Sequence, residues 1–502
     1  MIREQKSAII IGGGLGGLFT GAFLAKEGIK VIILEKNHTI GGGLQCFRRK
    51  GTLFETGMHI LGGFRKGNNL YRICSYLGIL DKLEIRDTDL NAMDSVTYGE
   101  DGRTYVLPSG KRSFTQYLKD MFPAESENIQ AYMDALYAIA QEVDLFYLRP
   151  SGLEMPTHSE DFLMPADEFI AKYVKDQRLR DLLAYMSPMY GGVAGHTPTY
   201  IHAMINVLYI DGSSQFVDGS QQMADRLAEL IKEYGGEVRA GDGVEKVEVV
   251  DRIVTKVFTQ GGNTYTADWY ISDVHPCTLF QLTGKDAFPR HYMQRIQSIP
   301  NSYSAFTLYI KFKPGSQPYV NHPRYYQEHY GSVWQLGDFH EESFPAGFMY
   351  ITPPTRDQDQ WANRMVVNCL MPFEAVRQWE NTYVGRRGKE YENWKKRLEN
   401  KLLAKLEDLL PGFKNTIDMC FSSSPLTIRD YLGVKEGSLY GHLCDCKNLL
   451  ASQMPIATKV RNLLLTGQNV NLHGICGVPL TAIQTAEAIV GHGKVLERIA
   501  NF

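Results

Sequence analysis

Residues 8–43 read AIIIGGGLGGLFTGAFLAKEGIKVIILEKNHTIGGG, and this stretch determines the fold that we expect for the chain. Ala8–Ile11 is a short apolar run, typical of a strand buried in a parallel sheet. A glycine-rich turn follows, and Leu18–Glu27 then has helical character. Lys30–Leu34 is a second apolar run that predicts the next strand. The order strand, turn, helix, strand is the context in which nucleotide-binding turns occur.

The turn carries the pattern G-x-G-x-x-G through Gly12, Gly14 and Gly17. The first glycine permits a tight turn, the second lets the backbone approach a pyrophosphate, and the third allows helix and strand to pack closely. The helix N-terminus adds free N–H groups and a partial positive charge. Glu35 lies 18 residues after Gly17, where a carboxylate can accept both hydroxyls of an adenosine ribose and would repel a 2′-phosphate. The stretch therefore predicts a site for FAD or NAD.

The residues after Glu35 favour FAD. With Gly41 and Gly42 they form the run E-x-x-x-x-x-G-G, which resembles flavoproteins of the amine oxidase and phytoene desaturase superfamily. In that superfamily the extension lies along the FAD, often with an arginine after the two glycines. This chain has Gly43 there, so it lacks that phosphate-contacting arginine.

The composition is that of an ordinary globular protein. The 502 residues can bury a large core, and 44% of them are hydrophobic and 22% charged. The formal net charge of −3 gives no reason to expect a nucleic-acid partner. Residues 8–25 carry no charge but contain six glycines, so we interpret them as the dinucleotide-binding stretch and not as a membrane span or an export signal.

The cysteines predict a reducing compartment. Eight cysteines without an export signal indicate free thiols, so we expect a cytoplasmic protein. Cys444 and Cys446 stand near His442, but no second pair follows at zinc spacing, and we predict no metal site.

The middle of the chain changes from a helical region back to α/β character. Residues 51–63 predict a strand pair, and residues 95–107 predict a hairpin. Apolar periodicity predicts helices at Asn69–Leu77, Ser113–Met121, Glu125–Asp144 and Ala166–Met186. Beyond residue 215 the expected elements are a helix at Gln221–Tyr234, strands at Glu237–Ala240, Val244–Val250, Ile253–Thr259, Trp269–Asp273, 303–312 and 364–372, and a charged helix at Trp379–Asp408.

The last informative stretch, residues 462–491, reads NLLLTGQNVNLHGICGVPLTAIQTAEAIVG. It predicts a buried strand at Leu463–Thr466, a glycine-containing loop and a helix that begins near Pro479. Such a helix N-terminus commonly faces the pyrimidine edge of a flavin and stabilises negative charge on the reduced ring. We therefore expect an α/β fold in which an FAD-binding Rossmann-like domain (residues 1–90, 213–290 and 431–502) carries an inserted α+β substrate domain (residues 91–212 and 291–430).

Phrases along nearly the whole chain resemble the phytoene desaturase and carotenoid isomerase superfamily, and within it the retinol saturase branch. The phrases are the N-terminal fingerprint through Gly42, Glu55-Thr56-Gly57-Met58-His59, Phe216–Gly219 with Gly235-Gly236, Pro425-Leu426-Thr427, Gly437-Ser438-Leu439-Tyr440-Gly441, and Leu465-Thr466-Gly467-Gln468-Asn469-Val470. The forms T-G-x-H and L-T-G-Q-[DN]-V favour the saturase branch.

The resemblance implies a two-domain flavoprotein with an apolar tunnel for a long isoprenoid or polyene. It implies that the ADP half of FAD is bound by Gly12, Gly14, Leu15, Gly16, Gly17, Glu35, Lys36, Gly42, Gly43 and Leu44. Val244 would contact adenine through its backbone, and Met58 and His59 would lie near the flavin ring. The ribityl chain and the pyrimidine edge would lie by Gly467, Asn469, Gly477 and Val478.

The implied activity is hydride transfer between flavin N5 and a carbon–carbon bond of a lipophilic polyene. His59 is the candidate proton carrier, and a structural histidine that hydrogen-bonds the loop or the flavin is an equally good interpretation. His473 is interpreted as a solvated loop histidine. We find no second G-x-G-x-x-G in strand–turn–helix context, so the electron donor or acceptor would be a separate molecule.

Several alternatives stay open from the sequence. Reduction, desaturation and isomerisation are all compatible with the residues, although the saturase phrases favour reduction. An amine oxidase would share the scaffold and need tyrosines converging near the flavin, whereas a prenyl- or lipid-binding carrier would lack the flavin. An apolar substrate also suggests peripheral membrane contact, with Leu145-Phe146-Tyr147-Leu148 as a candidate segment and core packing as its other interpretation.

Overall fold

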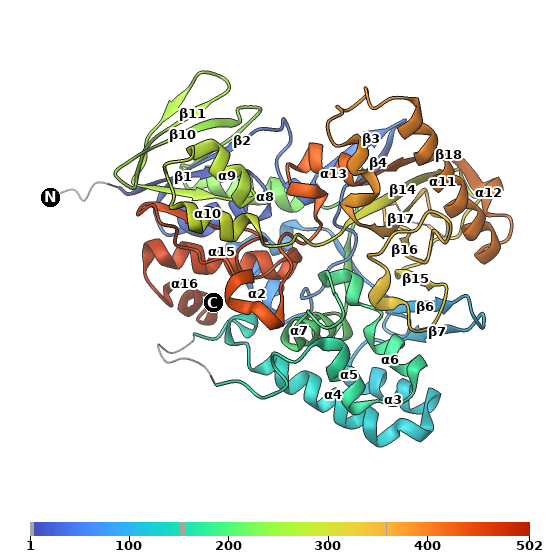
Figure 1. The fold of residues 1–502 in the computed structure, drawn as a ribbon. Coiled ribbons are helices and arrows are strands. Elements are labelled where there is room, and N and C mark those ends of the chain that lie inside the picture. Colours follow the sequence, from blue (N-terminus) through green and yellow to red (C-terminus); the bar gives the residue numbers. More distant parts are fainter. Residues whose placement is uncertain (1–4, 151–156, 358) are drawn as a thin grey trace.

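A five-stranded parallel sheet forms one half of the molecule in the computed structural model, which describes residues 5–150, 157–357 and 359–502. Its strands, in spatial order, are β19 (Leu463–Leu465), β13 (Trp269–Ser272), β1 (Ser7–Ile11), β2 (Lys30–Glu35) and β9 (Glu237–Ala240). Every neighbouring pair is parallel. Segments from the beginning, middle and end of the sequence thus lie side by side at the left of Figure 1.

Both faces of this sheet are covered, because β1 alternates apolar side chains between two cores. Ala8 and Ile10 join the core that contains α1 (Leu15–Lys26), whereas Ile9 and Ile11 join a second core. Helix α1 packs against α15 (Gly474–Val490) and α8 (Gln221–Glu233). The second core contains residues of the strands β10 (Val244–Val250), β11 (Ile253–Thr259) and β12 (Thr264–Tyr265) and the helices α9 (Pro276–Thr283) and α10 (Arg290–Gln297).

A seven-stranded mixed sheet forms the other half, at the right of Figure 1. Its strands, in spatial order, are β18 (Ile417–Ser423), β14 (Ser304–Phe312), β17 (Arg364–Met371), β16 (Gly347–Ile351), β15 (Arg324–Gln327), β6 (Asp94–Tyr98) and β7 (Thr104–Leu107). One face packs on the apolar stripe of α11 (Lys389–Leu409), which includes Trp394, Leu398 and Leu402. The other face is therefore available for a cavity between the two sheets.

Helices fill the space below the sheets in Figure 1. They are α3 (Lys111–Met121), α4 (Ser126–Gln141), α5 (Ala166–Tyr173), α6 (Gln177–Ala184) and α7 (Thr199–Ile210). The remaining strands and α-helices of the described chain are the pairs β3 (Cys46–Arg49) with β4 (Thr52–Glu55) and β5 (Ile85–Asp87) with β8 (Ser214–Phe216), and the helices α2 (Asn69–Leu77), α12 (Phe413–Thr416), α13 (Pro425–Leu432), α14 (Leu449–Ser452) and α16 (Lys494–Ala500).

Two predicted helices were wrong in their extent, each for a local reason. The helix expected over Ala166–Met186 is two helices, because Asp176 accepts the N–H groups of Arg178 and Leu179 and so caps a new helix. The helix expected from Trp379 begins ten residues later, at Lys389. Gly385 and Gly388 precede it with φ of +76° and +87°, a conformation that interrupts a right-handed helix.

Other boundaries also needed correction. Of the strand pair expected within residues 51–63, only β4 lies there; its partner β3 precedes this range, and residues 56–68 form no regular element. The candidate membrane-contact segment was residues 145–148. Two of its residues, Phe146 and Leu148, are only 7% and 2% exposed, so they belong to the core. The expected domain boundaries remain a prediction.

Three further findings concern the described residues. No helix among them is long and apolar enough to cross a membrane. Residues 5–150, 157–357 and 359–502 hold no cluster of three or more His, Cys, Asp or Glu side chains suited to a metal ion. The eight cysteines are all unpaired.

Candidate functional site

The glycine turn between β1 and α1 has no room for side chains. A methyl group on Gly17 would lie 2.2 Å from the carbonyl oxygen of Gly12, and one on Gly16 would lie 2.6 Å from the Cα atom of Gly467. Gly12 has φ of +104°, which favours glycine. The turn therefore presents bare backbone at the N-terminus of α1. Gly12, Gly14 and Gly16 line the principal cavity, whereas Gly17 serves the packing of the turn.

A buried carboxyl that our sequence reasoning did not select faces this turn. Asp273 directly follows β13, and its carboxyl accepts hydrogen bonds from the backbone N–H groups of Gly17 and Gly14. Burial raises the pKa of Asp273 to about 7, the negative charge of Glu35 acts in the same direction, and the two N–H groups oppose the rise. The sequence did place Asp273 at the end of a predicted strand. Its position there did not by itself indicate that the carboxyl belongs to the site.

Glu35 ends β2 at the same edge of the sheet. Its Oε2 accepts the N–H of Gly13 at 2.7 Å, and its Oε1 accepts the N–H of Asn37 at 2.8 Å. These bonds fix the carboxylate in the cavity wall, where further lone pairs remain for a ligand hydroxyl. The other predicted residues that line the cavity at this end are Leu15, Lys36, Gly42, Gly43, Leu44 and Val244.

Met58 and His59 also line the cavity. The His59 side chain is 6% exposed, and its Nδ1 lies 3.4 Å from Oε2 of Glu55, which is 3% exposed. This pairing matches the interpretation of His59 as an anchored histidine and leaves its catalytic role a prediction. The neighbouring Thr56 donates through its hydroxyl to the carbonyl oxygens of Gly43 and Gln45, which holds the loop against the glycine segment.

The C-terminal segment closes the opposite wall. Helix α15 begins at Gly474, five residues before the predicted start at Pro479. Asn469 and Val478 line the principal cavity, whereas Gly467 packs against the glycine turn and Gly477 lines a small adjoining void. His473, interpreted from sequence as a solvated loop residue, is only partly exposed. Burial lowers its pKa to about 4, and its ring centroid lies 5.1 Å from that of Tyr440.

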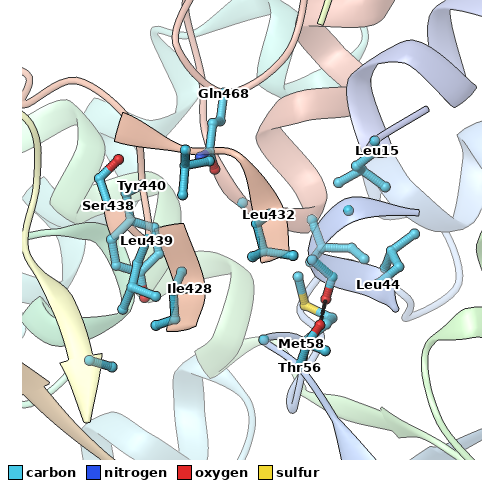
Figure 2. Close-up of a pocket in the computed structure, with 18 of the residues that line it drawn as sticks. Leu15, Leu44, Thr56, Met58, Ile428, Leu432, Ser438, Leu439, Tyr440 and Gln468 are labelled. Atoms are coloured by element: carbon cyan, nitrogen blue, oxygen red, sulfur yellow. Dashed lines mark hydrogen bonds between the residues drawn. The ribbon is translucent and has the colours of Figure 1, made fainter. Parts of the chain in front are cut away.

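The principal cavity, of about 410 Å³, continues from the glycine turn into an apolar chamber beside the seven-stranded sheet. Figure 2 shows Leu15, Leu44, Thr56 and Met58 on one side of it and Ile428, Leu439 and Tyr440 on the other. Strands β14 and β17 contribute alternate residues to the chamber wall, namely Ala305, Thr307, Asn368 and Leu370. Such a chamber suits an apolar ligand placed end-on to a bound nucleotide.

Tyrosines gather at the apolar end, which the sequence could not reveal. Tyr185, Tyr209, Tyr325, Tyr326 and Tyr440 all line the cavity. The rings of Tyr185 and Tyr325 meet edge to face with centroids 5.2 Å apart. The Tyr185 hydroxyl donates to Oδ2 of Asp94 at 2.6 Å. Sequence reasoning missed this pair because the two residues are 91 positions apart and belong to no motif.

The residues of the cavity fit FAD. The bare turn can accept a pyrophosphate, Glu35 can accept ribose hydroxyls, and the adjoining chamber can place an apolar substrate against a flavin ring. Fold and site together define a flavin-dependent oxidoreductase.

Comparison with known proteins identifies the family. Residues 15–490 match the family of flavin containing amine oxidoreductases, and the chain belongs to it. Its cofactor is FAD, and the α/β FAD-binding fold and the superfamily resemblance predicted from sequence are confirmed.

Three similar proteins illustrate this relationship. The all-trans-retinol 13,14-reductase of Rattus norvegicus is 26% identical over 97% of this chain and 86% of its own length. Prolycopene isomerase 1 of an Oncidium hybrid cultivar is 24% identical over 87% of this chain and 75% of its own. A crystal structure of an oxidoreductase from Methanosarcina mazei has the same fold, with a TM-score of 0.65 and 16% identity over 96% of this chain and all of that one.

Proposed function

We propose that this protein is an FAD-dependent oxidoreductase that acts on a carbon–carbon double bond of a lipophilic isoprenoid or polyene, with reduction as the favoured direction. The observation that carries the proposal is the single cavity that joins a glycine-lined nucleotide end to an apolar chamber. Relatives that are named for acting on retinol and prolycopene support the substrate class, and the reductase name of the first supports the direction.

The residues of the chain have three tasks in this proposal. The glycine turn and Glu35 bind the ADP half of the cofactor, with Lys36, Gly42, Gly43, Leu44 and Val244 around it. Gly467, Asn469, Gly477 and Val478 support the ribityl and pyrimidine side, and Met58 and His59 lie by the ring. The walls of β14, β17 and α13 hold an extended apolar chain and exclude water from it. When bound, FAD supplies hydride transfer at N5.

An amine substrate receives less support, although tyrosines do converge at the apolar end of the cavity. The carboxylates among the cavity-lining residues, Glu35 and Asp273, both lie at the glycine turn. In the described part of the chain, the apolar end thus offers no lining carboxylate to a cationic amine. The electron partner remains a separate molecule in this proposal, and peripheral membrane contact remains a prediction.

Anaerobic spectroscopy of the purified holoprotein tests the proposal. Flavin that is reduced chemically and then mixed with all-trans-retinol is expected to regain its oxidised visible spectrum while the polyene loses one double bond. Bleaching of oxidised flavin by the dihydro compound instead would assign desaturation. In a separate aerobic assay, hydrogen peroxide formation with polyamines, together with no anaerobic reaction with polyenes, would assign an amine oxidase. A colourless protein that cannot be reconstituted with FAD would contradict the enzymatic proposal.

A further inference from the structure

A buried acid and a tyrosine form a pair at the apolar end of the cavity. Asp94 opens β6 and is 1% exposed, and Tyr185 follows α6 and is also 1% exposed. The Tyr185 hydroxyl donates to Oδ2 of Asp94 at 2.6 Å, while Oδ1 of Asp94 has no hydrogen-bond partner among the described residues. Tyr185 lines the cavity, and Asp94 lies behind it.

Among the described residues, no cation compensates the Asp94 carboxyl. The titratable groups that face Asp94 from the packed elements of the described chain are Tyr185, Tyr209 of α7 and Tyr325 of β15. Burial raises the pKa of Asp94 to about 8, and the hydrogen bond from Tyr185 opposes the rise. The carboxyl is therefore mainly protonated at neutral pH. An asparagine could fill a purely structural role there, whereas a neutral carboxylic acid can also release a proton.

The pair lies near the segment proposed to adjoin the flavin ring. Tyr209, which faces Asp94, donates through its hydroxyl to the carbonyl oxygen of Ile60 at 3.4 Å. Ile60 directly follows His59 in the chain. Tyr185, Met58 and His59 all line the same cavity, so the chamber wall that holds Tyr185 is continuous with the segment proposed to adjoin the flavin ring.

We propose that Tyr185 is the proton donor to the substrate carbon in reduction of the double bond and that Asp94 is the positioning residue that resupplies its proton. This proposal rests on the proposed function. A hydride from reduced flavin forms a C–H bond at one carbon, and the π electron pair takes the phenolic proton at the adjacent carbon. The Tyr185 oxygen then takes the Asp94 proton, and the Asp94 carboxylate is reprotonated from water. The double bond is reduced by two electrons, and the flavin is oxidised by the same two.

His59 is the rival donor, and its surroundings differ. Both candidates have a carboxyl behind them: Nδ1 of His59 lies 3.4 Å from Oε2 of Glu55, and the Tyr185 hydroxyl lies 2.6 Å from Oδ2 of Asp94. The shorter bond favours the Tyr185–Asp94 pair as a proton relay, and burial raises the pKa of Asp94 to about 8, so that this carboxyl can hold a proton. A tyrosine donor also suits an apolar chamber, because the neutral phenol brings no charge into it.

The test uses holoprotein with chemically reduced FAD, mixed anaerobically with all-trans-retinol in D2O. Wild type is expected to reoxidise its flavin and to place solvent deuterium on both carbons of the reduced bond, one through the exchangeable N5 position of the flavin and one through the proton donor. Tyr185→Phe is expected to lower the reoxidation rate about 10²- to 10⁴-fold while retaining FAD and polyene binding. Tyr98→Phe is the matched control, because Tyr98 is a fully buried tyrosine on the same strand as Asp94 and does not line the cavity. Its rate should equal that of wild type.

The variant Asp94→Asn tests whether Asp94 supplies a proton or only supports the structure around Tyr185. The wild-type rate is expected to fall as pH rises above about 8, where Asp94 loses its proton, and Asp94→Asn is expected to be slower and to lack this decline. A wild-type rate in Tyr185→Phe, or a loss confined to His59→Ala, would overturn the proposal. An Asp94→Asn profile that keeps the decline would overturn the role of Asp94. If wild type itself does not react, the proposed function fails. If wild type reacts and Tyr185→Phe reacts equally fast, the proposed function stands and only the role of Tyr185 fails.

Discussion

At the scale of single residues, Asp273 brings a negative group to the place where a cofactor phosphate is expected. Its carboxyl takes the N–H groups of Gly14 and Gly17 that begin α1. With a pKa raised to about 7 by burial and by Glu35, it is protonated on the acidic side of neutrality and ionised on the basic side. An ionised Asp273 would repel the pyrophosphate proposed to bind here.

We therefore expect the affinity for FAD to decline as pH rises through about 7, by up to about tenfold per pH unit. Titration of the apoprotein with FAD, followed by quenching of flavin fluorescence between pH 6 and 9, measures this effect. Asp273→Asn should bind FAD with little dependence on pH. An equal decline in that variant would show that another group is responsible.

A second prediction at this scale concerns Gly17. A methyl group would lie 2.2 Å from the Gly12 carbonyl oxygen, and backbone atoms cannot rotate away as a side chain can. Gly17→Ala should lose about 1–3 kcal/mol of unfolding free energy and release FAD. Chemical denaturation of the apoprotein gives the first quantity. Gly43→Ala is the matched control for stability, because a methyl group there meets no atom within 4 Å. Equal stability of the two variants would contradict the packing argument.

At the scale of elements, β14 and β17 separate a structural face from a ligand face. Ala305 pairs with Leu370 and Thr307 with Asn368, and all four line the cavity. The intervening Phe306 and Cys369 join the core beneath α11. Because strand side chains alternate, a substitution on one face should leave the other face intact.

Ala305→Phe is expected to fill part of the chamber without touching the glycine turn. The protein should retain its flavin spectrum, while the polyene concentration for half-maximal flavin reoxidation rises at least about tenfold. Phe306→Leu, on the opposite face, should lower the melting temperature and leave that concentration unchanged. Unaltered polyene saturation in Ala305→Phe would contradict the assignment of the chamber to the substrate.

Elements with a strong local pattern were predictable, and those that depend on distant partners were not. The sequence indicated β1, α1 and β2 because apolar runs, glycines and an acid follow one another within 28 residues. It placed the start of α15 at Pro479, since a proline is common in a first turn, but the helix begins earlier at Gly474. The Tyr185–Asp94 pair and the tyrosine group depend on packing between segments far apart in sequence, which no periodicity reports.

At the scale of the whole molecule, buried neutral histidines link stability to pH. His202 is fully buried between the hydroxyls of Tyr132 and Tyr190, and burial lowers its pKa to about 3. His322 and His275 are lowered to about 4 in the same way, and neighbouring charges modify both. These histidines become protonated in the unfolded chain below about pH 6.5 but stay neutral in the folded protein.

Stability should therefore be retained above pH 6.5 and fall as pH decreases toward 4. His202→Gln is expected to reduce the slope of unfolding free energy against pH by about 1.4 kcal/mol per unit in this window. Urea denaturation at a series of pH values measures the slope. His291→Gln, at an exposed position, should not change it. An unchanged slope in His202→Gln would mean that this histidine does not contribute.

The order of strands in the parallel sheet also constrains how the protein is made. Strand β19 and helix α15 come from residues 463–490, yet they close the sheet and the cavity that β1 and α1 begin. During synthesis on a ribosome, one edge of β13 stays unpaired until β19 has been translated. An unpaired strand edge can pair with another nascent chain and so promote aggregation. FAD can therefore be enclosed only after residue 490 has been translated, and a chain cleaved between β13 and β19 would lose both the wall of the cavity and the protection of that edge.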